Sequence, residues 1–398
     1  MRTIYSCRDA ERRHRRRRSG SHSTHTVPIV FLLALKAPSR RRSALTSTIA
    51  LLTAWHLAAC ARQTAPVRAT ARRAPSAIAQ AGGTTALLQA VSVVDSATVW
   101  VSGHDATYAR TVDGGTTWAA AQVPGADSLE FRDVYAVNAS TAYLLAAGPG
   151  TRSRIYKTVD AGRSWALQWT NPAAKAFYDC MDFWDADHGM AVSDAVDGRF
   201  QIVATSDGGT HWQLLSEQSL PAAQPGEGAF AASGTCLVAQ SPATAWIGTG
   251  SAVVARVLRT SDRGRIWTSR PTPMPGGASA GVTTLAFRDA AHGVAAGGDI
   301  AKPLQHSTNV WFTNDGGATW EPGAQPPFPG AVYGAAWVPD ARAPTVLVVG
   351  PGGAAFSRDA GSSWITIDTV AYWAVGFASP HAGWAVGPGG RITKLSGF

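Results

Sequence analysis

Two carboxylates in this sequence stand in settings that could serve acid–base chemistry. Glu227 lies between two glycines and is followed by the apolar run 229–232, which favours a fixed conformation over simple solubility. Asp194 and Asp197 flank two apolar residues, and such a pair can hold a cation or sugar hydroxyls. Asp194 and Glu227 together could serve a glycoside hydrolase as its carboxylate pair. The alternatives are a solvated loop carboxylate for Glu227 and a pair that satisfies a turn for Asp194 and Asp197.

Metal and cofactor signals are missing from the sequence. It has no His-x-His, His-Glu-x-x-His or Cys-x-x-Cys spacing and no phosphate-binding Gly-Lys-Ser/Thr loop. We therefore expect no metal site and no cofactor, and redox chemistry has no motif to support it.

A repeated motif determines how the chain is organised. The pattern Ser/Thr-x-Asp-x-Gly-x-x-Trp occurs six times, first at Thr111–Trp118 and last at Ser357–Trp364. An Asp side chain bonds nearby backbone N–H groups, Gly permits a positive φ and Trp packs between sheets. The motif therefore predicts a turn, which we call the repeat turn. Its aspartates are expected to be structural: Asp113, Asp160, Asp207, Asp262, Asp315 and Asp359.

The repeat turns resemble the Asp-box, or BNR, repeat of sialidases, sortilin-type receptors and photosystem II assembly-factor-like propellers. In that resemblance the box joins the third and fourth strands of a propeller blade. With the strands before and after each box, the two further strand patterns of each interval make four strands per repeat, and the end of the chain adds one unit of three strands without a box. The sequence thus predicts an all-β propeller of four-stranded antiparallel blades over 84–398. We expect seven blades, with six or eight as alternatives, and a closing strand near 76–81.

Blade topology assigns loops to two faces. Repeat turns and the turns between first and second strands share one face. Loops into the innermost strand and loops between second and third strands share the other, which we call the loop face. Propellers usually hold a ligand there, near the axis. The predicted ligand-binding residues on this face are Arg132, Asp133, Asp179, Asp194, Asp197, Glu227, Ser233 and Asp299.

Two loops of the loop face are long, and the cysteines lie near one of them. Segments 213–235 and 298–309 have lengths typical of binding loops. Cys180 and Cys236 occupy equivalent places on neighbouring innermost strands. Such places are usually too far apart for a disulfide, so we favour two buried thiols over a bridge.

The N-terminal part has the features of an export signal. Twelve of the 35 Lys and Arg precede residue 61, against only Asp9 and Glu11, so the remaining 23 basic and 24 acidic residues nearly balance. This balance argues against nucleic-acid binding. Three arginines precede the apolar stretch 44–59, and Cys60 follows small residues as in a bacterial lipobox. We expect a leader over 1–60, a flexible tether over 61–83, and a periplasmic or cell-envelope lipoprotein, or alternatively a secreted protein.

Two classes of function compete on these observations. The resemblance to photosystem II assembly-factor-like propellers implies a scaffold or assembly role. On this interpretation we expect a monomeric, non-catalytic protein that binds a protein or glycan on the loop face. It touches a membrane only through a lipid anchor. The resemblance to sialidases implies a glycoside hydrolase, with Arg132 for a substrate carboxylate and Glu227 paired with a tyrosine. The sequence lacks the Phe/Tyr-Arg-Ile-Pro motif of that family, so we favour the scaffold.

Overall fold

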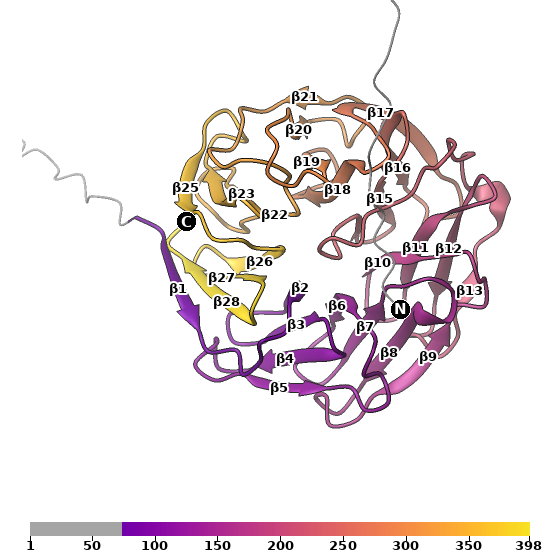
Figure 1. Cartoon of the computed structure of the whole chain (residues 1–398), viewed down its shortest axis with the longest axis horizontal. Coiled ribbons are helices and arrows are strands. Elements are labelled where there is room, and N and C mark those ends of the chain that lie inside the picture. Colours follow the sequence, from indigo (N-terminus) through magenta and orange to yellow (C-terminus); the bar gives the residue numbers. More distant parts are fainter. Residues whose placement is uncertain (1–73) are drawn as a thin grey trace, which may run out of the picture. The chain divides into compact units, whose positions relative to one another are not determined.

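The computed structural model describes residues 74–398, which form seven four-stranded antiparallel sheets in a ring (Figure 1). The predicted all-β propeller is confirmed, and it has seven blades. The helices of this range are two single 3-10 turns, η1 (Gly150–Arg152) and η2 (Glu217–Ser219). Over residues 74–398, no helix combines the length and the apolar character that crossing a membrane requires. The proposed export signal and Cys60 lie outside the described residues.

In each blade the strands are stacked from the axis outward (Figure 1). Blade 1 contains β2 (Leu88–Val93), β3 (Val99–Gly103), β4 (Thr107–Thr111) and β5 (Ala119–Gln122). Blade 2 contains β6 (Phe131–Ala136), β7 (Ala142–Ala146), β8 (Arg154–Thr158) and β9 (Ala166–Thr170). Blade 3 contains β10 (Tyr178–Phe183), β11 (Gly189–Val196), β12 (Arg199–Thr205) and β13 (Gln213–Leu214). Blade 4 contains β14 (Leu237–Gln240), β15 (Thr244–Gly248), β16 (Val254–Thr260) and β17 (Thr268–Pro275).

The remaining blades follow in the same order. Blade 5 contains β18 (Ala280–Phe287), β19 (Gly293–Asp299), β20 (Val310–Thr313) and β21 (Glu321–Pro322). Blade 6 contains β22 (Gly334–Trp337), β23 (Val346–Gly350), β24 (Gly353–Ser357) and β25 (Ile365–Asp368). Blade 7 contains β26 (Ala374–Ser379), β27 (Ala382–Gly387) and β28 (Arg391–Ser396), with β1 (Ser76–Gln80) as its outer strand.

The ring is closed by pairing the first strand of the described chain with the last. β1 runs antiparallel to β28, with Ser76 opposite Ser396 and Gln80 opposite Ile392. The side chain of Gln80 adds a second connection, because its Oε1 accepts hydrogen bonds from Trp118 Nε1 (3.2 Å) and Trp384 Nε1 (3.0 Å). Residues 76–80, at the end of the predicted tether, thus form the expected closing strand. The outer edge of β28 is thereby covered.

The six repeat turns share one hydrogen-bond pattern. In the first, Thr111 Oγ1 donates to Asp113 Oδ1 (2.8 Å) and accepts from Gly115 N (2.9 Å), while Thr117 N donates to the same carboxylate (2.9 Å). Gly115 has φ +83°, which only glycine adopts readily. The hydroxyl and backbone donors around Thr117 lower the pKa of Asp113 to about 2. These aspartates therefore close turns on the ring's repeat-turn face.

The hydrophobic core consists of seven clusters, and each fills the space between two neighbouring blades. Six of these clusters include a repeat-turn tryptophan, which packs on the preceding blade. Trp165, for example, contacts Trp100 and Tyr108 with ring centroids 6.1 and 5.1 Å apart. Between blades 6 and 7, where no repeat turn follows β28, Phe398 packs between two phenylalanines of these blades (5.2 and 5.4 Å).

Candidate functional site

Backbone hydrogen bonds establish the two faces of the ring. Ala106, between β3 and β4, donates to Leu129 (2.8 Å) and accepts from Val123 (3.0 Å), both in the loop that leads into blade 2. On the other face Gly114 of the first repeat turn donates to Ala97, between β2 and β3 (2.9 Å). Loops into the innermost strand therefore lie on the face opposite the repeat turns, as predicted.

Glu227 lies in a buried ion pair on the loop face. Its side chain is fully buried and faces the guanidinium of Arg256 in β16. Glu227 Oε1 accepts from Arg256 Nε (2.8 Å) and from the hydroxyl of Thr249 (2.7 Å). Oε2 accepts from Arg256 Nη2 and from the backbone N–H of Gln224 (2.7 Å). A carboxylate offers about four acceptor positions, so this one is saturated by protein donors.

The ion pair anchors a long loop, residues 221–236, which we call the crossing loop. Gly228 and Gly250 exchange two backbone hydrogen bonds (2.9 and 3.1 Å) next to Glu227. Further on, the hydroxyl of Ser233 donates to the carbonyl of Tyr333 in the loop leading into blade 6 (2.6 Å). The loop therefore starts from blade 3, is held by blade 4 and reaches blade 6. Its apolar residues 229–231 are buried.

The end of the crossing loop is covalently fixed. Cys180 in β10 and Cys236 form a disulfide with a Cα–Cα distance of 5.9 Å. The expectation of two free thiols is therefore wrong. Innermost strands converge towards the axis, and this brings the two Cα atoms within the usual 4.4–6.8 Å range for a disulfide.

Two aspartates of the innermost strands connect adjacent blades. Asp133 in β6 accepts from the backbone N–H of Met181 in β10 (2.6 Å), and Asp182 in β10 accepts from that of Ala239 in β14 (2.7 Å). The edge of an innermost strand that faces the axis has no partner strand, so these carboxylates occupy donors that would otherwise be open. Burial raises the pKa of Asp133 well above its ordinary value and that of Asp182 to about 7.

Asp179 and Asp194 lie beneath the crossing loop. Asp194 Oδ1 accepts from the backbone N–H of Ala229 (3.0 Å), and burial raises the pKa of Asp194 to about 6. Asp179 is 2 % exposed, and its Oδ2 has no hydrogen-bond partner among the described residues. Burial, reinforced by the neighbouring Asp194, raises the pKa of Asp179. The crossing loop therefore covers both Asp179 and Asp194, and its hydrogen bond from Ala229 fixes Asp194.

The other predicted residues are more accessible. Arg132 is about a third exposed, is paired with Glu130 (2.6 Å) and lies over the ring of Phe177 (5.9 Å). Asp197 is exposed and paired with Lys175 (3.1 Å). The remaining one, Asp299, closes a turn by accepting from Ser279 Oγ (2.6 Å) and the N–H of Ala301 (3.0 Å).

The structure thus brings Asp133, Asp179, Asp194, Glu227 and Ser233 together around the crossing loop. Arg132 lies close enough to Asp179 for its charge to oppose the rise in the pKa of that carboxyl. Asp197 and Asp299 are engaged by Lys175 and Ser279 instead. Sequence reasoning missed Arg256 and Asp182. Arg256 lies in β16, the third strand of blade 4, and no motif surrounds it there. Only its ion pair with Glu227 reveals its role. Asp182 lies between two buried residues of β10, and a carboxylate in that setting could have signalled a contact with the next blade.

One further motif is present in the chain and has no catalytic geometry. Residues 277–281 match Gly-x-Ser-x-Gly, the pattern around the nucleophile of α/β-hydrolases. Here the segment joins β17 to β18 instead of a strand to a helix, and the Ser279 hydroxyl donates to Asp299. Ser279 is therefore a turn residue.

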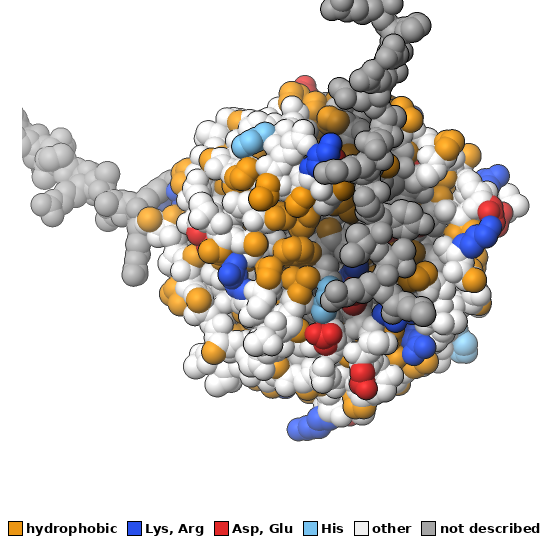
Figure 2. Space-filling view, viewed as in Figure 1, with side chains coloured by type: hydrophobic (Ala, Val, Ile, Leu, Met, Phe, Trp, Pro, Cys, Tyr) orange, Lys and Arg blue, Asp and Glu red, His pale blue; other side chains and the backbone are white. Residues whose placement is uncertain are grey.

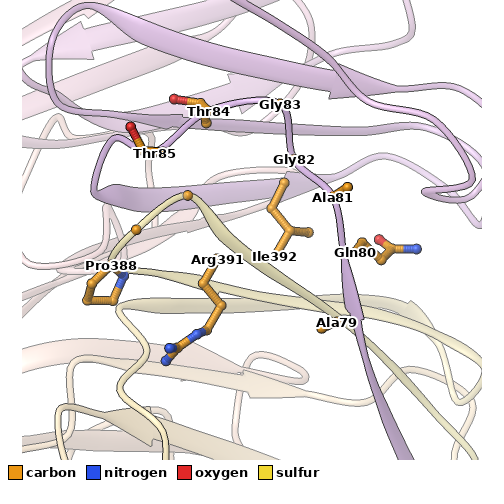
Figure 3. Close-up of a pocket in the computed structure, with 12 residues that line it drawn as sticks. Ala79, Gln80, Ala81, Gly82, Gly83, Thr84, Thr85, Pro388, Arg391 and Ile392 are labelled. Atoms are coloured by element: carbon orange, nitrogen blue, oxygen red, sulfur yellow. The ribbon is translucent and has the colours of Figure 1, made fainter.

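A groove of about 830 Å³ lies at the ring closure, between the segment 79–85 and the turn 388–392 (Figure 3). Gln80, Thr84, Thr85 and Arg391 supply its polar side chains, and the rest of its lining is apolar or glycine. Four further cavities lie between blades 3 and 4 or among blades 5 to 7, towards the repeat-turn face. In residues 74–398 no group of three or more His, Cys, Asp or Glu side chains could hold a metal ion.

Comparison with solved structures shows the same fold in other proteins. YCF48 bound to a D1 peptide is 18% identical over 81% of this chain and 96% of that chain, with a TM-score of 0.58. YCF48 from Cyanidioschyzon merolae is 16% identical over 81% and 99% of the two chains (TM-score 0.57). The WD40 β-propeller domain of Doa1 is 13% identical over 81% and 97% (TM-score 0.53). No protein-family model matches the sequence, and no curated protein matches it significantly.

Proposed function

We propose that this chain is an exported, non-catalytic propeller scaffold that binds a protein partner through its loop face. The observation that carries the proposal is the saturated carboxylate of Glu227. A nucleophile or general base needs a free oxygen lone pair directed at the substrate. Glu227 instead holds the crossing loop to Arg256, so the leading catalytic candidate acts as a structural anchor.

The shared fold supports a protein as the partner. A propeller with the same architecture has been solved with a D1 peptide, so this ring shape can present a peptide-binding surface. Arg132 offers an accessible cation for such a partner, since the side chain is about a third exposed. A glycan is the alternative ligand for the same face.

Two further parts of the proposal concern the repeats and the leader. The hydroxyl–Asp–Gly hydrogen bonds shared by the six repeat turns support assignment to the Asp-box class. For export, the arginines at 40–42, the apolar stretch 44–59 and Cys60 support a lipid-anchored protein of the periplasm or cell envelope.

Cross-linking in membranes from producing cells tests the scaffold. We expect one defined partner to be captured with the wild-type chain and lost with Arg132→Glu, since the reversed charge repels groups that Arg132 attracts. Arg163→Glu is the matched control, because Arg163 is exposed on the repeat-turn face. Equal capture by both variants would contradict the loop face as the binding surface. Turnover of any member of an aryl-glycoside panel by the wild-type chain would contradict the non-catalytic part.

A further inference from the structure

Charged side chains are distributed unevenly on the loop face. Around blades 1 to 3 its loops contain His104, Asp127, Glu130, Arg152 and Lys175. Four consecutive loop-face segments of blades 6 and 7 contain no Asp, Glu, Lys, Arg or His: residues 325–333, 351–352, 369–373 and 388–390. We call these four segments the apolar arc.

The absence of charge is specific to this face and not to these blades. On the repeat-turn face, blades 6 and 7 carry Asp340, Arg342, Arg358, Asp359 and His381. Figure 2 agrees: on its visible face, hydrophobic side chains gather near the centre of the ring over blades 5 to 7. The amino-acid composition of blades 6 and 7 therefore does not explain why the apolar arc lacks charged residues.

The segments of the arc form one continuous surface with its neighbours. Tyr372 N donates to the carbonyl of Gly350 (3.1 Å), which joins the third segment to blade 6. Ala331 N donates to Pro303 (3.0 Å), and this contact brings Leu304 of blade 5 next to the arc. Leu304 is 57% exposed and Val370 is 40% exposed. Large apolar side chains thus meet solvent in the arc and beside it.

An aromatic pair forms the inner end of the arc. Tyr333 and Trp373 each immediately precede an innermost strand, and their rings meet edge to face with centroids 5.1 Å apart. Tyr333 is buried and Trp373 is partly exposed. The hydroxyl of Ser233 in the crossing loop donates a hydrogen bond to the carbonyl of Tyr333, and this bond helps to fix the position of the aromatic pair. Rigid aromatic side chains of this kind are typical anchors of binding surfaces.

The charges nearest to the arc are already engaged. Arg391 donates to the carbonyl of Ala371 (2.8 Å) and lies over the ring of Tyr372 (5.7 Å). The Tyr372 hydroxyl in turn donates to Asp368 (2.9 Å). Beside Leu304, Lys302 faces Asp299 at 3.9 Å. A charged ligand segment would therefore find no opposite charge within the four segments themselves and would lose its hydration on contact.

We propose that the apolar arc binds an uncharged segment of the partner protein, with an aliphatic or aromatic side chain against Tyr333 and Trp373. The inference rests on the proposed scaffold function and specifies the chemistry of its partner. A protein segment fits better than a lipid surface. Membrane-binding faces combine protruding apolar residues with Lys and Arg, whereas the arc has no cation and its aromatic pair is recessed.

Selection of short peptides displayed on phage against the immobilised full chain tests this proposal. We expect the selected peptides to share an uncharged core with aromatic or aliphatic residues. Binding of one such synthetic peptide should weaken about tenfold or more in Val370→Asp and Leu304→Asp, because the new carboxylate is desolvated in the complex. Val159→Asp is the matched control, since Val159 is 66% exposed on the repeat-turn face. That variant should bind as the wild type does.

Other outcomes would overturn the proposal. A consensus of acidic or basic peptides would do so, and so would equal binding by the Val370→Asp and Val159→Asp variants. Sedimentation with phosphatidylcholine vesicles that depends on Val370 would assign the arc to a lipid surface. A dimer in sedimentation velocity that Val370→Asp dissociates would assign it to a second copy of the chain. If Arg132→Glu abolishes partner capture while Val370→Asp leaves it intact, the scaffold function stands and the arc proposal fails.

Discussion

Arg256→Met should be strongly destabilising, because it leaves the charge of Glu227 without its partner. The Glu227 side chain is fully buried. Arg256 donates two of its four hydrogen bonds and carries the positive charge of the ion pair. Breaking a buried pair from one side costs about 3–5 kcal/mol, against a total stability of about 5–15 kcal/mol for a domain. Urea unfolding followed by tryptophan fluorescence measures the change. At a slope of about 3 kcal/mol/M, the midpoint falls by about 1–1.7 M.

Two controls separate the lost ion pair from a lost side chain. The double variant Glu227→Gln/Arg256→Met removes both charges, and we expect it to recover most of the lost stability, because no buried charge remains. Lys175→Met breaks the ion pair to Asp197, whose side chains are 74% and 77% exposed. This change should cost no more than about 1 kcal/mol. The reasoning is refuted if Arg256→Met costs no more than Lys175→Met, or if the double variant is no more stable than Arg256→Met.

Three further predictions concern the ring itself. Burial raises the pKa of Asp182 from 3.8 to about 7, so between these pH values the folded state holds a proton that the unfolded state releases. The contribution of this proton to stability is complete below about pH 4 and is lost as the pH rises towards 7. Urea unfolding measured across this range should show the loss in the wild-type chain and not in Asp182→Asn. Cys180 and Cys236 should appear in one cross-linked pair of peptides in a non-reduced digest, and free thiols at both positions in air-oxidised protein would contradict the disulfide. In the Cys180→Ser/Cys236→Ser variant the free energy of unfolding should fall by about 4 kcal/mol, from the chain entropy of a loop with a sequence separation of 56. Gln80→Leu removes the acceptor shared by two indole N–H groups and should cost about 1–3 kcal/mol, measured as a lower thermal midpoint, whereas an unchanged midpoint would show that water replaces this acceptor.

The parts of the fold that could be predicted from the sequence are those whose bonds are local. In a repeat turn, Thr111, Asp113 and Gly115 bond to each other or to residues within four positions, so the motif itself contains the structure. The closing strand was predictable for a different reason. After the last repeat turn, one strand completes blade 6 and the three that follow leave blade 7 incomplete, so a strand from the N-terminal side must complete it.

The candidate site depends on contacts between distant residues, which the sequence does not reveal. Glu227 could be placed on the loop face, but its partner Arg256 lies 29 residues away in another element. The disulfide was misjudged because equivalent positions on neighbouring blades diverge with distance from the axis, and these two lie near it. The role of Phe398 in the place of a repeat-turn tryptophan depends on the missing turn of blade 7.

The pairing of β1 with β28 sets the order in which this protein can complete its fold. Blades 1 to 6 consist of strands that are consecutive in the chain, so each can assemble soon after its own residues have been synthesised. Blade 7 cannot, because Ser76 must wait for Ser396, 320 residues later. Joining ends so far apart adds little free-energy cost over a shorter loop, since the entropy of closure grows only with the logarithm of length. The delay is kinetic: until β28 arrives, both β1 and the edge of β27 are open to pairing with other chains, and this interval is when the protein most needs protection from aggregation.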